Sequence, residues 1–269
     1  MMNNSILIGQ YFEAKSIFHR LDPRSKIICI SVIMLSFITL ETITSYIAAT
    51  LLVFLLLRLS NIPLKIFLKG LKPLIFILSF TFLYHLFLTK GTTVIWSWNF
   101  IHITLEGLIQ GIRFVWRIIL LVLVASFLTL TTKPLSLAAG LEKLLAPLSK
   151  LHLPVEQLSL MIVIAIRFIP TILQELDRIL LAQKARGFDI NALPIHKRLF
   201  AYIPMLVPLL FTTVQRAEQL TYAIDARAYG NGKGRTYYIE LRFQKIDYQI
   251  ISSTLLIALA FVLLKIGGI

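Results

Sequence analysis

The chain has 269 residues, of which 57% are hydrophobic and 15% are charged, whereas about a quarter of the residues in soluble domains are charged. This composition excludes an ordinary soluble protein and indicates an integral membrane protein. Its 27 lysines and arginines outnumber 13 acidic residues, for a net charge of +14. In so apolar a chain, that excess favours a cytoplasmic face beside anionic lipid over a nucleic-acid partner.

Five apolar segments are predicted to cross the membrane, because a spanning helix needs about 20 mostly apolar residues. The first two form a pair separated by a short turn at Glu41 and Thr42, the next two follow, and the fifth closes the chain. The predicted spans are residues 27–40, 43–57, 71–89, 108–130 and 248–264.

Lysines and arginines set the expected orientation, because short cytoplasmic loops are enriched in them. Basic residues flank the first span on its N-terminal side and follow the second span, whereas the turn at 41–45 has none. The N-terminus is therefore expected in the cytoplasm, with residues 133–245. Residues 90–106 are expected outside, where Trp96, Trp98 and Phe100 form an interfacial aromatic belt.

The predicted topology divides the chain into three regions: a four-span membrane region at 1–132, a cytoplasmic region at 133–247, and a final span with its tail at 248–269. The middle region is rich in proline, which is expected to separate it into several helices. Its prolines are Pro134, Pro147, Pro154, Pro170, Pro194, Pro204 and Pro208.

Two long amphipathic helices are predicted in the cytoplasmic region, which makes the fold class an all-α membrane protein with a helical arm between spans four and five. Their apolar residues recur at helical spacing. An alternative makes 155–173 and 199–214 further spans, or segments that dip into the membrane, but it places basic residues on the wrong face. The apolar positions are Ile169, Ile172, Leu173, Leu176, Ile179 and Leu180 in the first helix and Leu210, Val214 and Ala217 in the second.

The two amphipathic helices end in similar tripeptides, Ala185-Arg186-Gly187 and Ala226-Arg227-Ala228, which lie 41 residues apart. Other residues match at the same offset, which suggests two copies of one docking device. A simpler interpretation of either arginine alone is a cation at the negative end of a helix dipole, with a small residue at the C-cap. The pair favours a contact surface, because small neighbours let a partner approach while a guanidinium reaches an acidic or carbonyl-lined groove.

With these tripeptides, Leu21-Asp22-Pro23-Arg24-Ser25-Lys26 before the first span and Thr131-Thr132-Lys133-Pro134 after the fourth, the chain resembles the transmembrane T component of energy-coupling factor (ECF) transporters. These are prokaryotic importers of vitamins and trace metals. The resemblance runs nearly end to end. The second tripeptide of this chain departs from the family pattern, because Ala228 stands where glycine is usual.

The resemblance implies a non-catalytic subunit in a prokaryotic cell membrane. Each arginine would sit in a groove of one of two ABC-type ATPases, which bind the ATP and Mg²⁺, so this chain would hold no cofactor or metal of its own. The apolar faces of the arm would support a substrate-binding S component, which chooses the substrate, and a T component of this family serves one exchangeable S component or several.

Three other motifs have simple structural interpretations. Asp22 before Pro23 predicts a helix start with an aspartate cap, and Thr132 before Lys133-Pro134 predicts another. The glycine-rich segment 230–235 lacks the phosphate-loop pattern and is interpreted as a basic turn.

The alternative function is a stand-alone membrane carrier or membrane enzyme. It is disfavoured because no acidic residue lies within the five predicted spans, whereas ion-driven carriers usually hold one there. Arg113 and Arg117 are the cations to explain in the fourth span. They could pair with the substrate-binding partner, bind helix carbonyls, or reach to outer headgroups.

Overall fold

The computed structural model describes residues 11–14, 16–98, 101–151, 155–188, 194, 200, 202–228 and 241–267. The chain forms two compact units. The bundle unit contains residues 9–144 and 241–269, and the arm unit contains residues 1–8 and 145–240. The three regions expected from the topology divide the chain in a different way and stay a prediction.

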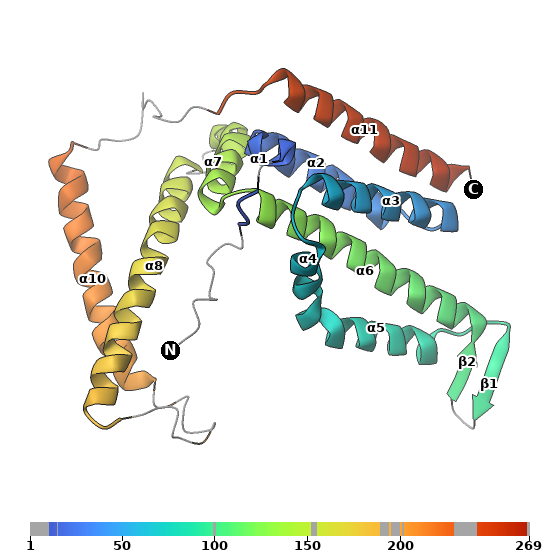
Figure 1. Cartoon of the computed structure of the whole chain (residues 1–269), viewed down its shortest axis with the longest axis horizontal. Coiled ribbons are helices and arrows are strands. Elements are labelled where there is room, and N and C mark those ends of the chain that lie inside the picture. Colours follow the sequence, from blue (N-terminus) through green and yellow to red (C-terminus); the bar gives the residue numbers. More distant parts are fainter. Residues whose placement is uncertain are drawn as a thin grey trace. The chain divides into compact units, whose positions relative to one another are not determined.

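The described part of the bundle unit is mainly helical (Figure 1). Its elements in chain order are α1 (Ile17–Arg20), α2 (Pro23–Ile38), α3 (Ile43–Leu59), α4 (Leu64–Leu71), the 3-10 turn η1 (Lys72–Leu74), α5 (Ile75–Leu88), β1 (Val94–Trp98), β2 (Ile101–Thr104), α6 (Leu105–Thr131), α7 (Pro134–Leu145) and α11 (Lys245–Ile266).

Side-chain caps fix where several of these helices begin. The carboxylate of Asp22 accepts a hydrogen bond from the backbone N–H of Arg24 at 2.8 Å, with Pro23 in the first turn, which confirms the predicted start of α2. The hydroxyls of Thr42 and Thr104 cap α3 and α6 in the same way. Such caps satisfy N–H groups that the helix itself leaves free.

The helix predicted after Thr132 does begin there, at Pro134, but Thr132 is not its N-cap. Thr132 is extended and ends α6, and α7 begins at Pro134. Instead, the Thr132 hydroxyl accepts a hydrogen bond from the buried Lys26 ammonium at 3.1 Å.

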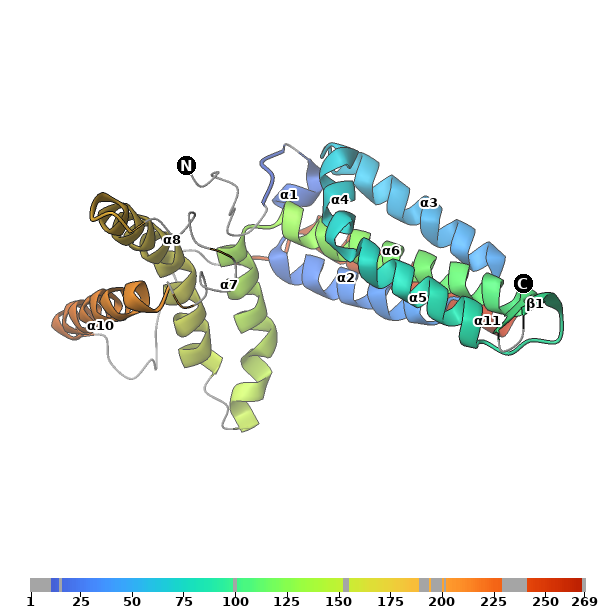
Figure 2. The ribbon, with the colours of Figure 1, turned by 90° about the horizontal axis from the view of Figure 1, so that it is seen from below.

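The core of the bundle unit lies among α2, α3 and α6, and α11 adds Phe261. α2 packs against both α6 and α11, and α5 runs beside α6 (Figures 1 and 2). Phe37 of α2 is completely buried and meets Phe261 edge to face, with ring centroids 5.8 Å apart. Outside the core, large apolar side chains are widely exposed, and Phe76 of α5 reaches 80% exposure. An apolar surface of that kind is typical of a membrane-facing protein.

Glycines bring α5 and α6 close together. At Gly107 an added Cβ would lie 2.8 Å from the backbone oxygen of His85, and at Gly111 it would lie 3.2 Å from the Phe82 ring. These two glycines are four residues apart and lie on one helical face. Their spacing is the small-residue pattern that lets membrane helices approach closely.

Among the described residues, four helical segments are long and apolar enough to cross a membrane. Three of them, Leu64–Leu88, Leu105–Thr131 and Lys245–Ile266, overlap predicted spans. The fourth, Gln157–Ala185, belongs to the predicted cytoplasmic arm. The first two predicted spans form the shorter helices α2 and α3, with 16 and 17 residues. The molecule is a membrane protein, and its five-span topology stays a prediction.

A β-hairpin joins α5 to α6, so the expectation of an all-α chain is wrong at this point. β1 and β2 are antiparallel, with a register irregularity between Val94 and Trp96. The carboxylate of Glu106 accepts hydrogen bonds from the backbone N–H groups of Thr92 and Thr93, at 3.1 and 3.2 Å. Aromatic and β-branched residues in this loop favour strands. Trp96 and Trp98 lie in β1, whereas Phe100, the third belt residue, lies outside the described residues.

The arm unit contains the 3-10 turn η2 (Ala146–Leu151), α8 (Val155–Ala185) and α10 (Ile203–Ala226). Pro170 lies inside α8 and Pro208 inside α10, so the expectation that these two prolines end helices is wrong. A proline removes one hydrogen bond and bends a helix, which long apolar helices with other contacts tolerate. Pro204 lies in the first turn of α10, where proline is favoured.

Candidate functional site

The first candidate tripeptide forms the C-terminal cap of α8. The backbone N–H of Gly187 donates to the oxygen of Lys184, and that of Phe188 donates to the oxygen of Gln183, both at 3.0 Å. Gly187 has a φ of +87°. This pattern is a Schellman cap, in which a left-handed residue closes the last helical turn. Arg186 is the capping residue and its side chain is exposed.

The second tripeptide ends α10 with similar geometry. Arg227 is again the capping residue, and the backbone N–H of Ala228 donates to the oxygen of Asp225 at 2.9 Å. Ala228 has a φ of +50°, so it takes the left-handed conformation that glycine takes in α8. Each arginine therefore sits at an exposed helix end of matching shape. The small residue that follows it has a conformational role, in addition to the close approach predicted from its size.

The two caps predict opposite effects of exchanging glycine and alanine. Gly187→Ala should destabilise the end of α8 by about 1 kcal/mol, because nothing lies within 4 Å of the added methyl and only the left-handed backbone is penalised. Ala228→Gly should stabilise the end of α10 by a similar amount. Hydrogen exchange of the amides in each last turn should change by about fivefold in opposite directions. Changes of the same sign in both variants would contradict the shared cap geometry.

α8 and α10 run in opposite directions and pack against each other (Figure 1). The guanidinium of Arg216 donates to the carboxylate of Glu175 at 3.1 Å. Met205, only 1% exposed, packs against Ile179 and Leu180. The later part of α8 thus lies beside the start of α10.

The crossing gives the internal repeat a geometric meaning. Glu175 and Arg216, which pair between the helices, are themselves 41 residues apart, the same offset that separates the two tripeptides. Arg186 and Arg227 each lie eleven residues beyond this pair, which is about 16 Å along each helix. Because the helices run in opposite directions, the arginines point to opposite ends of a pair with approximate twofold symmetry.

Within the described residues, the predicted apolar stripes of α8 and α10 differ in how far they are buried. In α8, Ile172, Leu173, Leu176 and Leu180 are partly buried, whereas Ile169 is 39% exposed. In α10, Leu210, Val214 and Ala217 are all exposed. The buried residue of α10 is Met205, which the periodicity did not single out.

A second group of polar residues, which we call the junction network, lies in the bundle unit where α2 and α11 begin. Asp247 is 1% exposed. Its carboxylate accepts hydrogen bonds from the backbone N–H of Asp22 at 3.1 Å, from the hydroxyl of Ser25 at 2.7 Å and from the backbone N–H of Gln244 at 2.8 Å. The network joins residues more than two hundred positions apart.

Arg24 and Lys26 complete the junction network. Arg24 forms a two-point ion pair with Asp22, at 3.1 and 2.9 Å, which raises the pKa of its guanidinium. It also donates to the backbone oxygen of Leu241 at 2.9 Å. The Lys26 ammonium is 4% exposed and donates to the backbone oxygen of Thr131 at 3.1 Å. Two acids and two bases thus balance in charge.

Sequence reasoning identified Asp22 as a helix cap but missed its neighbours in space. Asp247 stands in the first turn of α11, where an acid is expected at any helix start. The signal that could have found the network is the unusual charge density of 22–26, immediately before an apolar span.

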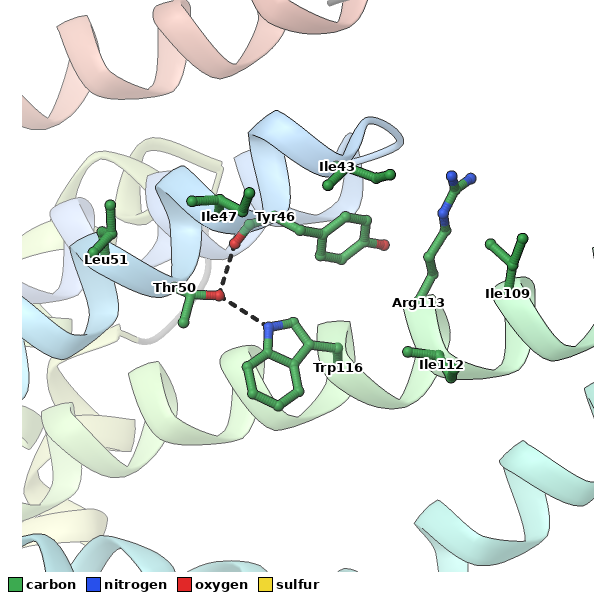
Figure 3. A pocket seen from close by; sticks show the side chains of 9 residues that line it. All are labelled: Ile43, Tyr46, Ile47, Thr50, Leu51, Ile109, Ile112, Arg113 and Trp116. Carbon is green, nitrogen blue, oxygen red and sulfur yellow. Dashed lines mark hydrogen bonds between the residues drawn. The ribbon is translucent and has the colours of Figure 1, made fainter.

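Of the two intramembrane arginines, Arg117 contacts a backbone carbonyl, one of the expected alternatives. It donates to the oxygen of Leu40, just after α2, and its guanidinium lies 6.0 Å from the ring centroid of Tyr46. Arg113 lines a groove of about 570 Å³ between α3 and α6. Figure 3 shows its side chain between those of Tyr46 and Ile109, away from the hydrogen bond that Trp116 donates to Thr50 at 2.9 Å.

Comparison with known proteins gives one consistent result. The family model of CbiQ, described as a cobalt transport protein, matches residues 14–238. The energy-coupling factor transporter transmembrane protein EcfT of Ruminiclostridium cellulolyticum is 41% identical over 253 residues, 94% of each chain. EcfT of Staphylococcus aureus is 40% identical over the full length of both chains, and EcfT of Bacillus subtilis is 39% identical over 96% of this chain and 97% of its own.

These matches confirm the resemblance seen in the sequence. Their printed names describe the membrane-embedded protein of a transporter and no catalytic activity. The name energy-coupling factor transporter also implies a complex with other components. The chain belongs to the EcfT family and is a transmembrane component of an ECF transporter.

Proposed function

We propose that this chain is the scaffold subunit that transmits ATP-driven movement of two ABC-type ATPases to a substrate-binding S component, for import of a vitamin or another micronutrient. Each ATPase receives one arginine, Arg186 or Arg227. The ATP and Mg²⁺ belong to the ATPases. The N-terminus and the arm lie on the cytoplasmic side of a prokaryotic plasma membrane.

The observation that supports this proposal is the pair of matching helix ends. Two exposed arginines, each the cap of a long helix and each followed by a left-handed small residue, lie eleven residues beyond the Glu175–Arg216 pair on their own helices. Two similar partners related by a twofold axis would meet two equivalent contacts. A guanidinium at a helix end offers several fixed donors to carboxylates or carbonyls.

The S component is proposed to cover the apolar face of α10. Leu210, Val214 and Phe211 are exposed by 64%, 55% and 66%. An apolar face of this size is typical of a surface that contacts lipid or another protein. Substrate choice would then lie in the partner, and a single scaffold could serve more than one S component.

The first test is affinity purification of the tagged full chain from its native membranes in mild detergent, followed by mass spectrometry and an ATPase assay. Two ABC-type ATPases and one or more small apolar membrane proteins are expected, with ATP hydrolysis in the eluate. A chain recovered alone, whose purified form transports or modifies a substrate unaided, would favour the stand-alone carrier or enzyme instead.

A further inference from the structure

The junction network lies where the chain leaves the bundle unit for the arm and where it returns. α6 ends at Thr131, and the arm unit begins at residue 145, the last residue of α7. The arm unit ends at residue 240, and Leu241 is the first residue back in the bundle unit. Lys26 holds the departing backbone at Thr131, and Arg24 holds the returning backbone at Leu241.

Each chain crossing has a second contact with the same short segment of α2. On the departing side, Gly140 of α7 lies against Pro23, so closely that an added Cβ would come within 3.1 Å of the proline side chain. On the returning side, the Phe243 ring lies under the Arg24 guanidinium, 4.1 Å from its centroid. Residues 22–26 therefore contact both crossings.

The contacts at this position are buried and directional. Ser25 and Asp247 are 0% and 1% exposed, and the Asp22 side chain is 3% exposed. Hydrogen bonds in which the donor or the acceptor is ionised are stronger in such surroundings than those between neutral groups, and they hold a defined geometry. The network thus makes more directional contacts than a helix cap on α2 requires.

We infer that residues 22–26 and Asp247 form a clamp that fixes the two places in the bundle unit where the chain leaves for the arm and where it returns. Movement that reaches these two places is then passed to α2, α6 and α11. This inference rests on the proposed function. It makes Arg24, Lys26 and Asp247 positioning residues for energy coupling, distinct from the arginines at the helix ends.

The structural part of the clamp is tested on the purified full chain alone. Arg24→Ala and Asp247→Asn should raise hydrogen exchange at residues 241–247 by about tenfold or more. The first removes the donor to the Leu241 oxygen, and the second removes the negative charge and one of the two acceptor oxygens of Asp247. Exchange in α3 and α5 should stay unchanged. Unchanged exchange at 241–247 would overturn the clamp, whether or not the ATPases bind.

The functional part is tested with the native complex in proteoliposomes, with a panel of tritiated vitamins as probes. Arg24→Ala and Asp247→Asn should reduce uptake per ATP hydrolysed at least tenfold, while recovery of the ATPases and the rate of hydrolysis stay within about twofold of the wild type. Arg24→Lys keeps the charge but cannot donate two parallel hydrogen bonds to the Asp22 carboxylate. Its uptake per ATP hydrolysed should lie between those of the wild type and of Arg24→Ala.

The outcomes separate the clamp from a merely structural role. If uptake and hydrolysis fell together, or if neither changed, the clamp would be wrong. Ser25→Ala removes one hydrogen bond to Asp247 and no charge. It replaces the charge variants in the test if those do not accumulate in the membrane. It should lower the uptake per ATP hydrolysed by a smaller factor than they do. A wild-type chain that recovers no ATPase would refute the proposed function and leave the exchange result standing.

Discussion

Replacing both Arg186 and Arg227 by alanine is expected to separate this chain from its ATPase partners and abolish ATP-driven uptake. Loss of one partner of a buried, hydrogen-bonded charge pair at an interface costs about 2 to 5 kcal/mol. Each site should therefore lose roughly 30-fold to several thousandfold in affinity. Lysine should rescue poorly, because it cannot reproduce the planar set of donors. The readouts are ATPase recovery in the affinity purification and uptake of tritiated vitamins in membrane vesicles.

A matched control exists on the same helix. Arg178 of α8 is 74% exposed and lies 3.7 Å from Glu175, an exposed pair of the kind that contributes little to stability. Arg178→Ala should leave recovery and uptake nearly unchanged. The two single variants should each lose one contact, so retention of one ATPase by each would assign the sites. If the double variant kept both ATPases and normal uptake, the arginines would be helix caps and nothing more.

The residues of the candidate site could be found from the sequence because their signal is local. A repeated tripeptide at the end of an apolar periodicity needs only the spacing of neighbouring residues to be recognised. The left-handed conformation of Ala228 is not visible in that pattern, since alanine seldom takes it. Only the cap geometry reveals that alanine and glycine occupy equivalent positions.

The crossing of α8 and α10 could not be predicted from periodicity. An apolar stripe says which face of a helix avoids water, but here one face can meet lipid, a partner or the other helix. Met205 became the buried residue, whereas Leu210 stayed exposed. The prediction that the prolines of this region end helices failed for a related reason. Pro170 and Pro208 lie within helices whose other contacts compensate for a single lost hydrogen bond.

The junction network could not be predicted from the sequence for a different physical reason. Asp22 and Asp247 are far apart in sequence, and each has a complete local explanation as a residue at a helix start. Nothing in a local pattern then signals a missing partner. The β-hairpin between α5 and α6 was not predicted because each of its strands is a short apolar segment. Periodicity cannot distinguish such a segment from an interfacial loop.

The contact between α5 and α6 gives the prediction with the largest effect on stability. Gly107→Leu is expected to lower the free energy of unfolding of the bundle by about 3 kcal/mol or more. The first added carbon would already stand 2.8 Å from the backbone oxygen of His85, an atom that cannot rotate away. Thermal unfolding in mild detergent, followed by tryptophan fluorescence, measures the change.

Graded substitutions separate this close approach from the general effect of adding a side chain. Gly107→Ala should destabilise more than Gly111→Ala, because the neighbour at Gly111 is the edge of the Phe82 ring, at 3.2 Å, and can shift. Gly70→Ala is the control: its new methyl would meet the Ser126 hydroxyl at 3.6 Å, an ordinary contact. Alanine also favours a helix over glycine by about 1 kcal/mol, so Gly70→Ala should be neutral or stabilising. If all three alanine variants unfolded alike, the glycines would not set the spacing of α5 and α6.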